Sequence, residues 1–117
     1  MLIMKRKFDI RVWVTVPSWN PLKIYIYREC YLRFSGTDYD PRCHKNLFSH
    51  LTNNSIGKKS SQKGNQKIPG NMWSLDEFKE YLGKQNAMEE DEEDEIVKEG
   101  NRLWDTEWYP QVKEIIV

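Results

Sequence analysis

The chain has 117 residues, enough for one small domain with a modest hydrophobic core. Aromatic residues make up 13% of it and charged residues 31%, and this content of Trp and Tyr excludes a wholly disordered chain. No run of about 18 apolar residues occurs and the N-terminus lacks a secretory apolar stretch, so the sequence predicts a soluble intracellular protein with two reduced cysteines, Cys30 and Cys43.

The formal net charge of zero conceals an uneven distribution of charge along the chain. Residues 1–70 contain 13 Lys and Arg against 4 Asp and Glu, whereas residues 71–117 contain 5 against 14. The basic part is expected to attract an anionic partner, which leaves a nucleic acid, a nucleotide or an acidic protein segment open. The acidic part is dominated by seven consecutive carboxylates at residues 89–95, for which we expect a solvated, mobile insertion or linker over residues 84–101.

The first predicted element is a strand over residues 7–16. Successive side chains of a strand point to opposite faces, so this segment has one apolar and one largely charged face. The apolar face holds Phe8, Ile10, Val12, Val14 and Val16, and the other face holds Lys7, Asp9, Arg11, Trp13 and Thr15. Three charged residues in consecutive outward positions are typical of a sheet that presents charge to a charged ligand. From composition alone, a cross-strand ion pair is the simpler explanation of Asp9 and Arg11.

Two further strands are predicted after a turn at residues 17–21, which contains two prolines. The second strand covers Leu22–Tyr27, and the third covers Cys30–Phe34 after a tight turn. Together the three strands form an antiparallel meander that is suited to line one wall of a cleft. The following pattern is weaker, with an apolar island rich in hydrogen-bonding side chains at residues 47–55.

The clearest helix is predicted at Leu75–Leu82, with a capping box before it and Gly83 as its natural stop. A last helix is predicted over Trp104–Val117, with Pro110 tolerated near a start or a kink. Strands come first and helices after, so the predicted fold class is α+β.

No candidate residue identifies a function by itself. Arg33 alone is explained by a surface charge, and His50 by a satisfied core or capping histidine. Cys43 and His44 are adjacent rather than spaced for chelation, so a zinc site is not predicted. The sequence also contains no glycine-rich phosphate loop of the Walker or dinucleotide type.

In their order along the chain, however, several segments resemble the tubulin–tyrosine ligase-like family. They are Lys7-Phe8-Asp9-Ile10-Arg11, Tyr27-Arg28-Glu29, Tyr31-Leu32-Arg33-Phe34 and His50-Leu51-Thr52-Asn53-Asn54-Ser55. Asn71-Met72-Trp73 and the run from Trp104 to Tyr109-Pro110 are most similar to the glycine-adding branch. The resemblance covers most of the chain and implies that residues 1–117 are the central part of a ligase domain that is incomplete at both ends.

The resemblance implies an ATP-grasp-like fold and a ligase that uses ATP and magnesium. Such an enzyme joins an amino acid, glycine in this branch, to glutamate side chains of tubulin tails through an acyl phosphate. The residues implied at the nucleotide are Lys7, Asp9, His50, Thr52 and Asn53. Those implied to be catalytic and to hold substrate carboxylates are Arg11 and Arg33, with Ser55 beside the amino acid.

The family's magnesium ligands and its earlier nucleotide-binding strands have no match in this sequence. We therefore expect that the fragment alone is inactive as a ligase, and the alternatives are a non-catalytic module that binds tubulin tails, or a remnant. A nucleic-acid binder is a more distant alternative. The expected partners are tubulin or microtubules and a free amino acid, with no nucleic acid and no membrane. The expected location is the cytoplasm and cytoskeleton, including the axoneme of a cilium or flagellum.

Overall fold

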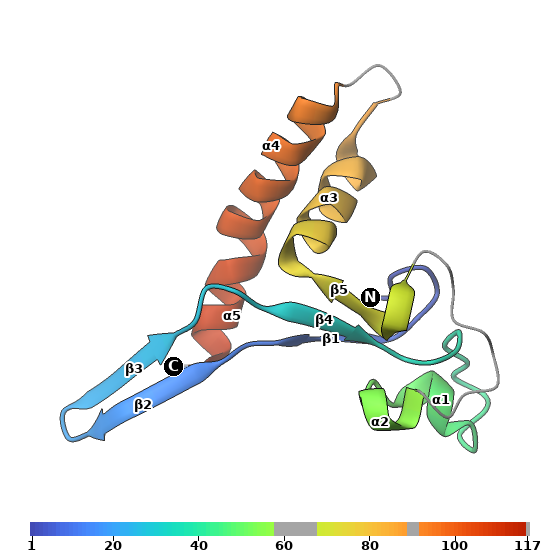
Figure 1. Ribbon diagram of the computed structural model, residues 1–117, viewed down its shortest axis with the longest axis horizontal. Helices are drawn as coiled ribbons and strands as arrows, with labels where there is room; N and C mark the ends of the chain where they lie inside the picture. Colours follow the sequence, from blue (N-terminus) through green and yellow to red (C-terminus); the bar gives the residue numbers. More distant parts are fainter. Residues whose placement is uncertain (58–67, 89–91, 117) are drawn as a thin grey trace. The chain divides into compact units, whose positions relative to one another are not determined.

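The computed structural model describes residues 1–57, 68–88 and 92–116. The chain divides into two compact units, unit 1 with Met1–Arg11 and Cys30–Ser74, and unit 2 with Val12–Glu29 and Leu75–Val117. The strands are β1 (Phe8–Arg11), β2 (Val14–Trp19), β3 (Leu22–Ile26), β4 (Tyr31–Phe34) and β5 (Met72–Ser74) (Figure 1). The helices are α1 (Leu47–His50), α2 (Asn54–Gly57), η1 (Pro69–Asn71), α3 (Leu75–Asn86), α4 (Glu93–Leu103), η2 (Trp104–Trp108) and α5 (Tyr109–Ile116). The fold class is α+β, with antiparallel strands followed by helices, as the sequence predicts.

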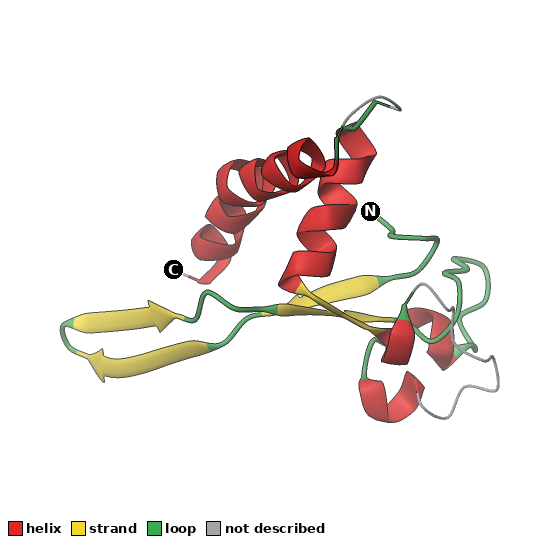
Figure 2. Ribbon diagram, turned by 45° about the horizontal axis from the view of Figure 1, so that its top comes forward, coloured by secondary structure: helices red, strands yellow, loops and turns green. Residues whose placement is uncertain are grey.

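Unit 1 is built on a three-stranded antiparallel sheet with the order β1-β4-β5 (Figure 2). The register places Phe8 opposite Phe34 and Leu32 opposite Trp73, so the apolar side chains share one face. The Phe34 and Trp73 rings meet edge to face with their centroids 4.9 Å apart. Among the described residues, the apolar side chains buried in this unit are Ile3, Cys30, Leu32, Phe34, Ile68 and Trp73. The charged side chains of β1 and β4 are thereby left on the opposite face.

The single strand predicted over residues 7–16 is wrong, because the structure divides this segment between two sheets. β1 ends at Arg11 and pairs with β4, whereas β2 begins at Val14 and pairs with β3 in a separate two-stranded sheet. The predicted turn at residues 17–21 also begins too early. Pro17 lies inside β2, where the register shifts between Thr15 and Ser18, an irregularity that accommodates a residue without an N–H group.

The helices of unit 2 begin with α3, which packs against α4 at two glycines. A Cβ atom at Gly83 would lie 2.0 Å from the backbone oxygen of Ile96, and one at Gly100 would lie 2.0 Å from that of Lys79. The prediction that Gly83 ends the helix is therefore wrong, because α3 continues to Asn86. Gly83 instead allows the backbones of α3 and α4 to approach each other.

One continuous helical segment, formed by α4, η2 and α5, follows α3. The predicted helix start at Trp104 is wrong, because Trp104 directly follows α4 and begins the π-helical turn η2. The Phe78 ring of α3 meets Trp108 edge to face at 5.1 Å, and this aromatic contact belongs to the core of unit 2.

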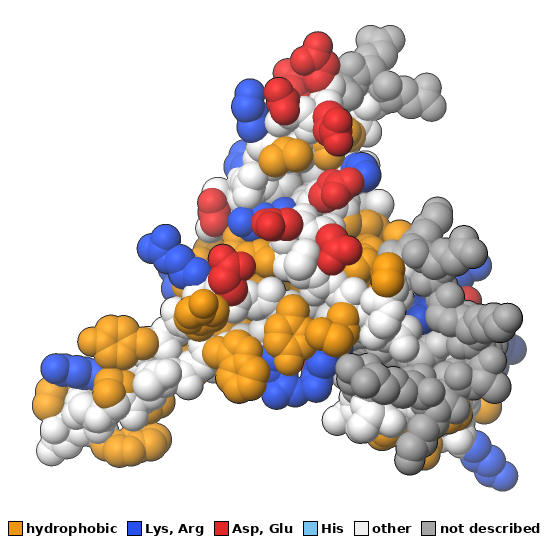
Figure 3. Space-filling model, in the orientation of Figure 1, with side chains coloured by type: hydrophobic (Ala, Val, Ile, Leu, Met, Phe, Trp, Pro, Cys, Tyr) orange, Lys and Arg blue, Asp and Glu red, His pale blue; other side chains and the backbone are white. Residues whose placement is uncertain are grey.

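The acidic segment is partly helical. Within residues 84–101, the structure contains the end of α3 and most of α4. Glu92 precedes α4 and three acidic residues form its first turn, where the helix dipole favours negative charge. Acidic side chains gather over the α3 and α4 region of the surface shown in Figure 3. Residues 89–91 lie outside the described part, so the predicted mobility of the run stays a prediction there. In the described ranges, no helix is both long and apolar enough to cross a bilayer.

Candidate functional site

The centre of the candidate site is an ion pair between Asp9 on β1 and Arg33 on β4. These residues lie opposite each other in the antiparallel register. Arg33 Nε donates a hydrogen bond to Asp9 Oδ1 at 3.0 Å, and Nη2 donates a second one to Oδ2. The hydrogen bond to Asp9 raises the pKa of the Arg33 guanidinium above its ordinary value. The cross-strand ion pair that composition favours for Asp9 is thus present, with Arg33 as the partner.

Two more cations lie near this ion pair in the sequence, one on β1 and one just before it. Arg11 is half-buried and lies opposite Tyr31, and Lys7 is exposed just before the first residue of the strand. By strand alternation Asp9 and Arg11 share one face, which is the face opposite the apolar core. The Arg33 side chain is only 17% exposed, and its two hydrogen bonds to Asp9 fix the orientation of the guanidinium. The arrangement suits a carboxylate or phosphate group, for which arginine provides a planar pair of donors.

A second group of predicted site residues lies in and after the short helix α1. His50 is the last residue of α1, and its Nε2 lies 2.9 Å from the backbone oxygen of Cys43. The Tyr39 ring meets the His50 ring edge to face at 5.5 Å, so the imidazole is held on two sides. Thr52 is half-buried, and the backbone oxygen of Asn53 accepts a hydrogen bond from Ile56 N–H at 3.0 Å.

Ser55 lies in α2 and is exposed. All eight predicted site residues therefore belong to unit 1, in two groups: the sheet group of Lys7, Asp9, Arg11 and Arg33, and the helical group of His50, Thr52, Asn53 and Ser55. Between these predicted residues, the structure shows direct side-chain contact for Asp9 with Arg33. In the helical group, the His50 ring and the backbone oxygen of Asn53 have hydrogen-bond partners within residues 43–56.

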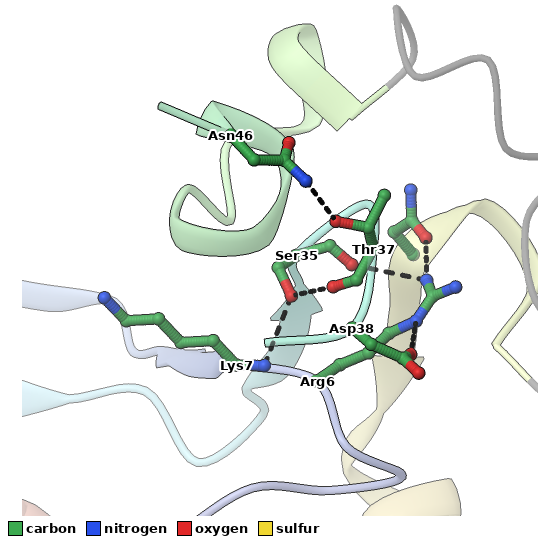
Figure 4. A network of polar contacts seen from close by, with 7 residues as sticks. Arg6, Lys7, Ser35, Thr37, Asp38 and Asn46 are labelled. Atoms are coloured by element: carbon green, nitrogen blue, oxygen red, sulfur yellow. Dashed lines mark hydrogen bonds and ion pairs between the residues drawn. The ribbon is translucent and has the colours of Figure 1, made fainter. Parts of the chain in front are cut away.

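Arg6 is a buried charged residue that no sequence motif singles out. Its Nη1 donates to the backbone oxygen of Ser35 at 3.3 Å and to Asn71 Oδ1 at 2.9 Å (Figure 4). Its Nε lies 3.9 Å from Asp38 Oδ1 and has no hydrogen-bond partner. Arg6 is 4% exposed, and it joins the start of the chain to segments 29 and 65 residues away. In the sequence it is merely the middle of three consecutive cations.

The chemistry of these side chains fits an anionic ligand better than a bound metal ion. In the described part of the chain, no group of three or more His, Cys, Asp or Glu side chains is arranged to hold a metal. Asp9 has both carboxylate oxygens engaged by Arg33. Lys7 and Arg11 add positive charge that a phosphate or carboxylate would neutralise.

Comparisons with known proteins agree with the sequence motifs. Residues 1–112 match the model of the Tubulin-tyrosine ligase family. The chain is 39% identical over 118 residues to tubulin glycylase 3D of Tetrahymena thermophila, an alignment that covers 99% of this chain and 10% of that protein. It is 44% identical over 87 residues to protein monoglycylase TTLL8 of Mus musculus, an alignment that covers 72% of this chain and 10% of that protein. It is 41% identical over 92 residues to tubulin monoglycylase TTLL3 of Homo sapiens, an alignment that covers 74% of this chain and 12% of that protein. The chain thus spans about a tenth of the length of these relatives.

Proposed function

Because the chain belongs to the tubulin–tyrosine ligase family, we propose that it forms part of an ATP-dependent ligase that adds glycine to glutamate side chains of tubulin tails. The relatives are named as glycylases of tubulin or of protein. The observation that carries the proposal is the charged sheet face of unit 1, where Asp9 orients Arg33 beside Arg11. The corresponding location is the cytoskeleton, including the axoneme of a cilium or flagellum.

When bound, ATP would supply a phosphoryl group that converts the acceptor carboxylate into an acyl phosphate, with release of ADP. The amine of the amino acid would then attack the acyl phosphate, displace inorganic phosphate and lose a proton. Arg11 and Arg33 hold the carboxylates of the acceptor and of the amino acid, and their fixed charge opposes the repulsion between these anions. Ser55 lies beside the amino acid. The nucleotide is held by the polar side chains Lys7, Asp9, His50, Thr52 and Asn53. Magnesium would offset the negative charge of the nucleotide, and we expect its ligands outside this chain.

The charge of the basic part supports the acceptor assignment. Tubulin tails are rich in glutamate, and residues 1–70 carry an excess of nine positive charges, which would raise the association rate of an acidic peptide. This steering is screened by salt, because the Debye length falls to about 8 Å at physiological ionic strength. The charge therefore favours an acidic peptide as the partner.

Ligand binding by the 117-residue chain tests the nucleotide assignment directly. Titration calorimetry with Mg·ATP would compare the wild type with Lys7→Gln, and with Lys98→Gln on the exposed surface of α4 as the matched loss of one lysine charge. We expect Lys7→Gln to weaken ATP binding at least about tenfold, which is about 1.4 kcal/mol, and Lys98→Gln to leave it unchanged. Equal affinities of the wild type and Lys7→Gln would refute the assignment of Lys7.

A second candidate function is a non-catalytic module that binds tubulin tails, because the excess of positive charge in residues 1–70 suits an acidic peptide without any reaction. Incubation of the full-length protein that contains this chain with microtubules, Mg·ATP and labelled glycine separates the two candidates, because the 117-residue chain alone is expected to be inactive. Incorporation of label that is lost in Arg11→Ala supports the ligase. Binding of a glutamate-rich tail peptide without incorporation, lost in Arg11→Ala but kept in Arg102→Ala, supports the module.

A further inference from the structure

Ser35 connects the end of β4 to Lys7, just before β1, through two hydrogen bonds, and it binds Thr37 through a third. It directly follows β4 and is fully buried. Its hydroxyl oxygen accepts a hydrogen bond from Lys7 N–H at 3.2 Å and donates one to the backbone oxygen of Thr37 at 2.9 Å (Figure 4). Its own N–H donates to the backbone oxygen of Lys7 at 2.8 Å. The buried Arg6 binds the Ser35 carbonyl as well, so the residue is fixed from both sides.

Thr37 continues this network to α1. Its N–H donates to the backbone oxygen of Phe48 at 3.1 Å, and its hydroxyl accepts from Asn46 Nδ2 at 3.5 Å. Asn46 is the N-cap of α1, and its Oδ1 accepts a hydrogen bond from Phe48 N–H at 3.1 Å. A helix of four residues does not persist alone, so its position depends on these contacts. His50 ends this helix, and Thr52 and Asn53 follow it.

The network therefore joins the two groups of site residues, which have no sequence proximity. We propose that Ser35 is a positioning residue, which fixes the segment carrying His50 to Asn53 relative to Lys7 and Asp9, so that both groups meet the same nucleotide. The proposal rests on the proposed function for the identity of the ligand. The positional link itself rests on the buried hydrogen bonds of Ser35 and Thr37.

The test uses the 117-residue chain with Ser35→Ala, which removes the hydroxyl and keeps the backbone. The matched control is Ser18→Ala in unit 2, where the lost hydroxyl donates to the backbone oxygen of Pro21 at 2.8 Å. Amide hydrogen exchange reports local opening at each bonded N–H. We expect Ser35→Ala to speed exchange of the Thr37 and Phe48 amides about five- to tenfold, the size expected for losing one buried hydrogen bond. Ser18→Ala leaves both amides unchanged.

A second pair of variants separates positioning from mere structural support. Thr37→Val removes the hydroxyl at nearly constant volume, and Thr37→Ser keeps it. We expect weaker Mg·ATP binding, again about five- to tenfold, in Ser35→Ala and Thr37→Val, with recovery in Thr37→Ser. The positioning role is overturned if Ser35→Ala speeds hydrogen exchange at the Lys7 amide alone. It is also overturned if the wild-type chain binds ATP and the Ser35→Ala and Thr37→Val variants bind it with the same affinity. A wild-type chain that binds no ATP contradicts the proposed function instead, and the exchange pattern then decides the positional link alone.

Discussion

Replacement of Gly100 by alanine tests the close crossing of α3 and α4. A Cβ at this position would lie 2.0 Å from the backbone oxygen of Lys79, whereas an ordinary contact begins at 3.4 Å. The shortfall is 1.4 Å, and a backbone oxygen cannot turn aside as a flexible side chain can. The two helices therefore have to separate, which also opens the matching contact of Gly83 with Ile96.

Two opposing contributions decide the sign of the effect on stability. Alanine is favoured over glycine inside a helix by about 1 kcal/mol. Overpacking of a close interface costs about 1–3 kcal/mol, and more when backbones have to move. Separation of the helices also weakens the packing of Phe78 and Leu82, which are buried in α3. We expect the steric cost to prevail, with a net loss of about 2 kcal/mol in the free energy of unfolding.

Urea denaturation followed by far-UV circular dichroism and Trp fluorescence measures this free energy. The exposed Lys98 on the same helix provides the control, because the difference between Lys98→Ala and Lys98→Gly isolates helix propensity. A Gly100→Ala variant that is more stable than the wild type by that same difference would refute the close crossing.

Two smaller predictions concern the turn at Lys5, before β1, and the surface of α4. Lys5 has a φ of 64°, so Lys5→Gly should raise the free energy of unfolding by about 0.5–1 kcal/mol in the same urea assay, and a destabilised variant would contradict the strain. Hydrogen bonds from Arg102 and then Asn86 lower the pKa of Glu99 from 4.5 to about 2. Its contribution to stability is therefore complete above pH 4.5 and is lost as the pH falls toward 2. NMR titration should show the low pKa of Glu99 in the wild type and its return toward 4.5 in Arg102→Gln. An ordinary pKa of Glu99 in the wild type would exclude its hydrogen bond with Arg102.

The strands whose bounds were predicted correctly are those that neighbouring residues in the sequence define. The predicted strands at Leu22–Tyr27 and Cys30–Phe34 agree with β3 and β4 within one residue at each end, because alternation and turn residues bound them. The break between β1 and β2 has no local signal, since apolar alternation runs unbroken to Val16. Only the pairing of β1 with β4 and of β2 with β3 reveals it.

The helices show the same limit. A glycine near the end of a helical pattern predicts a stop, yet Gly83 serves the approach of α4, a helix that the sequence did not predict. The start of α4 was missed because consecutive carboxylates indicate a solvated chain, although a helix N-terminus accepts them as well.

The candidate site was predictable as a set of residues and not as a geometry. Strand alternation places Asp9 and Arg11 on one face, but the partner of Asp9 depends on the register with β4. The burial of Arg6 depends on Ser35 and Asn71, which lie 29 and 65 residues away. A contact of that sequence separation leaves no trace in the local pattern of three cations.

The register of β1 with β4 has a consequence for protein engineering. Unit 1 consists of two stretches of chain, and Arg11 lies directly opposite Tyr31 at the end of their shared ladder. Antiparallel strands with facing ends can be closed by a two-residue type I′ turn, for which Asn-Gly is the preferred sequence. Substitution of Asn-Gly for residues 12–30, followed by termination after Ser74, would turn unit 1 into one short polypeptide. That miniature carries all eight proposed site residues and is small enough for complete chemical synthesis, including isotopically labelled or non-natural side chains at Arg33.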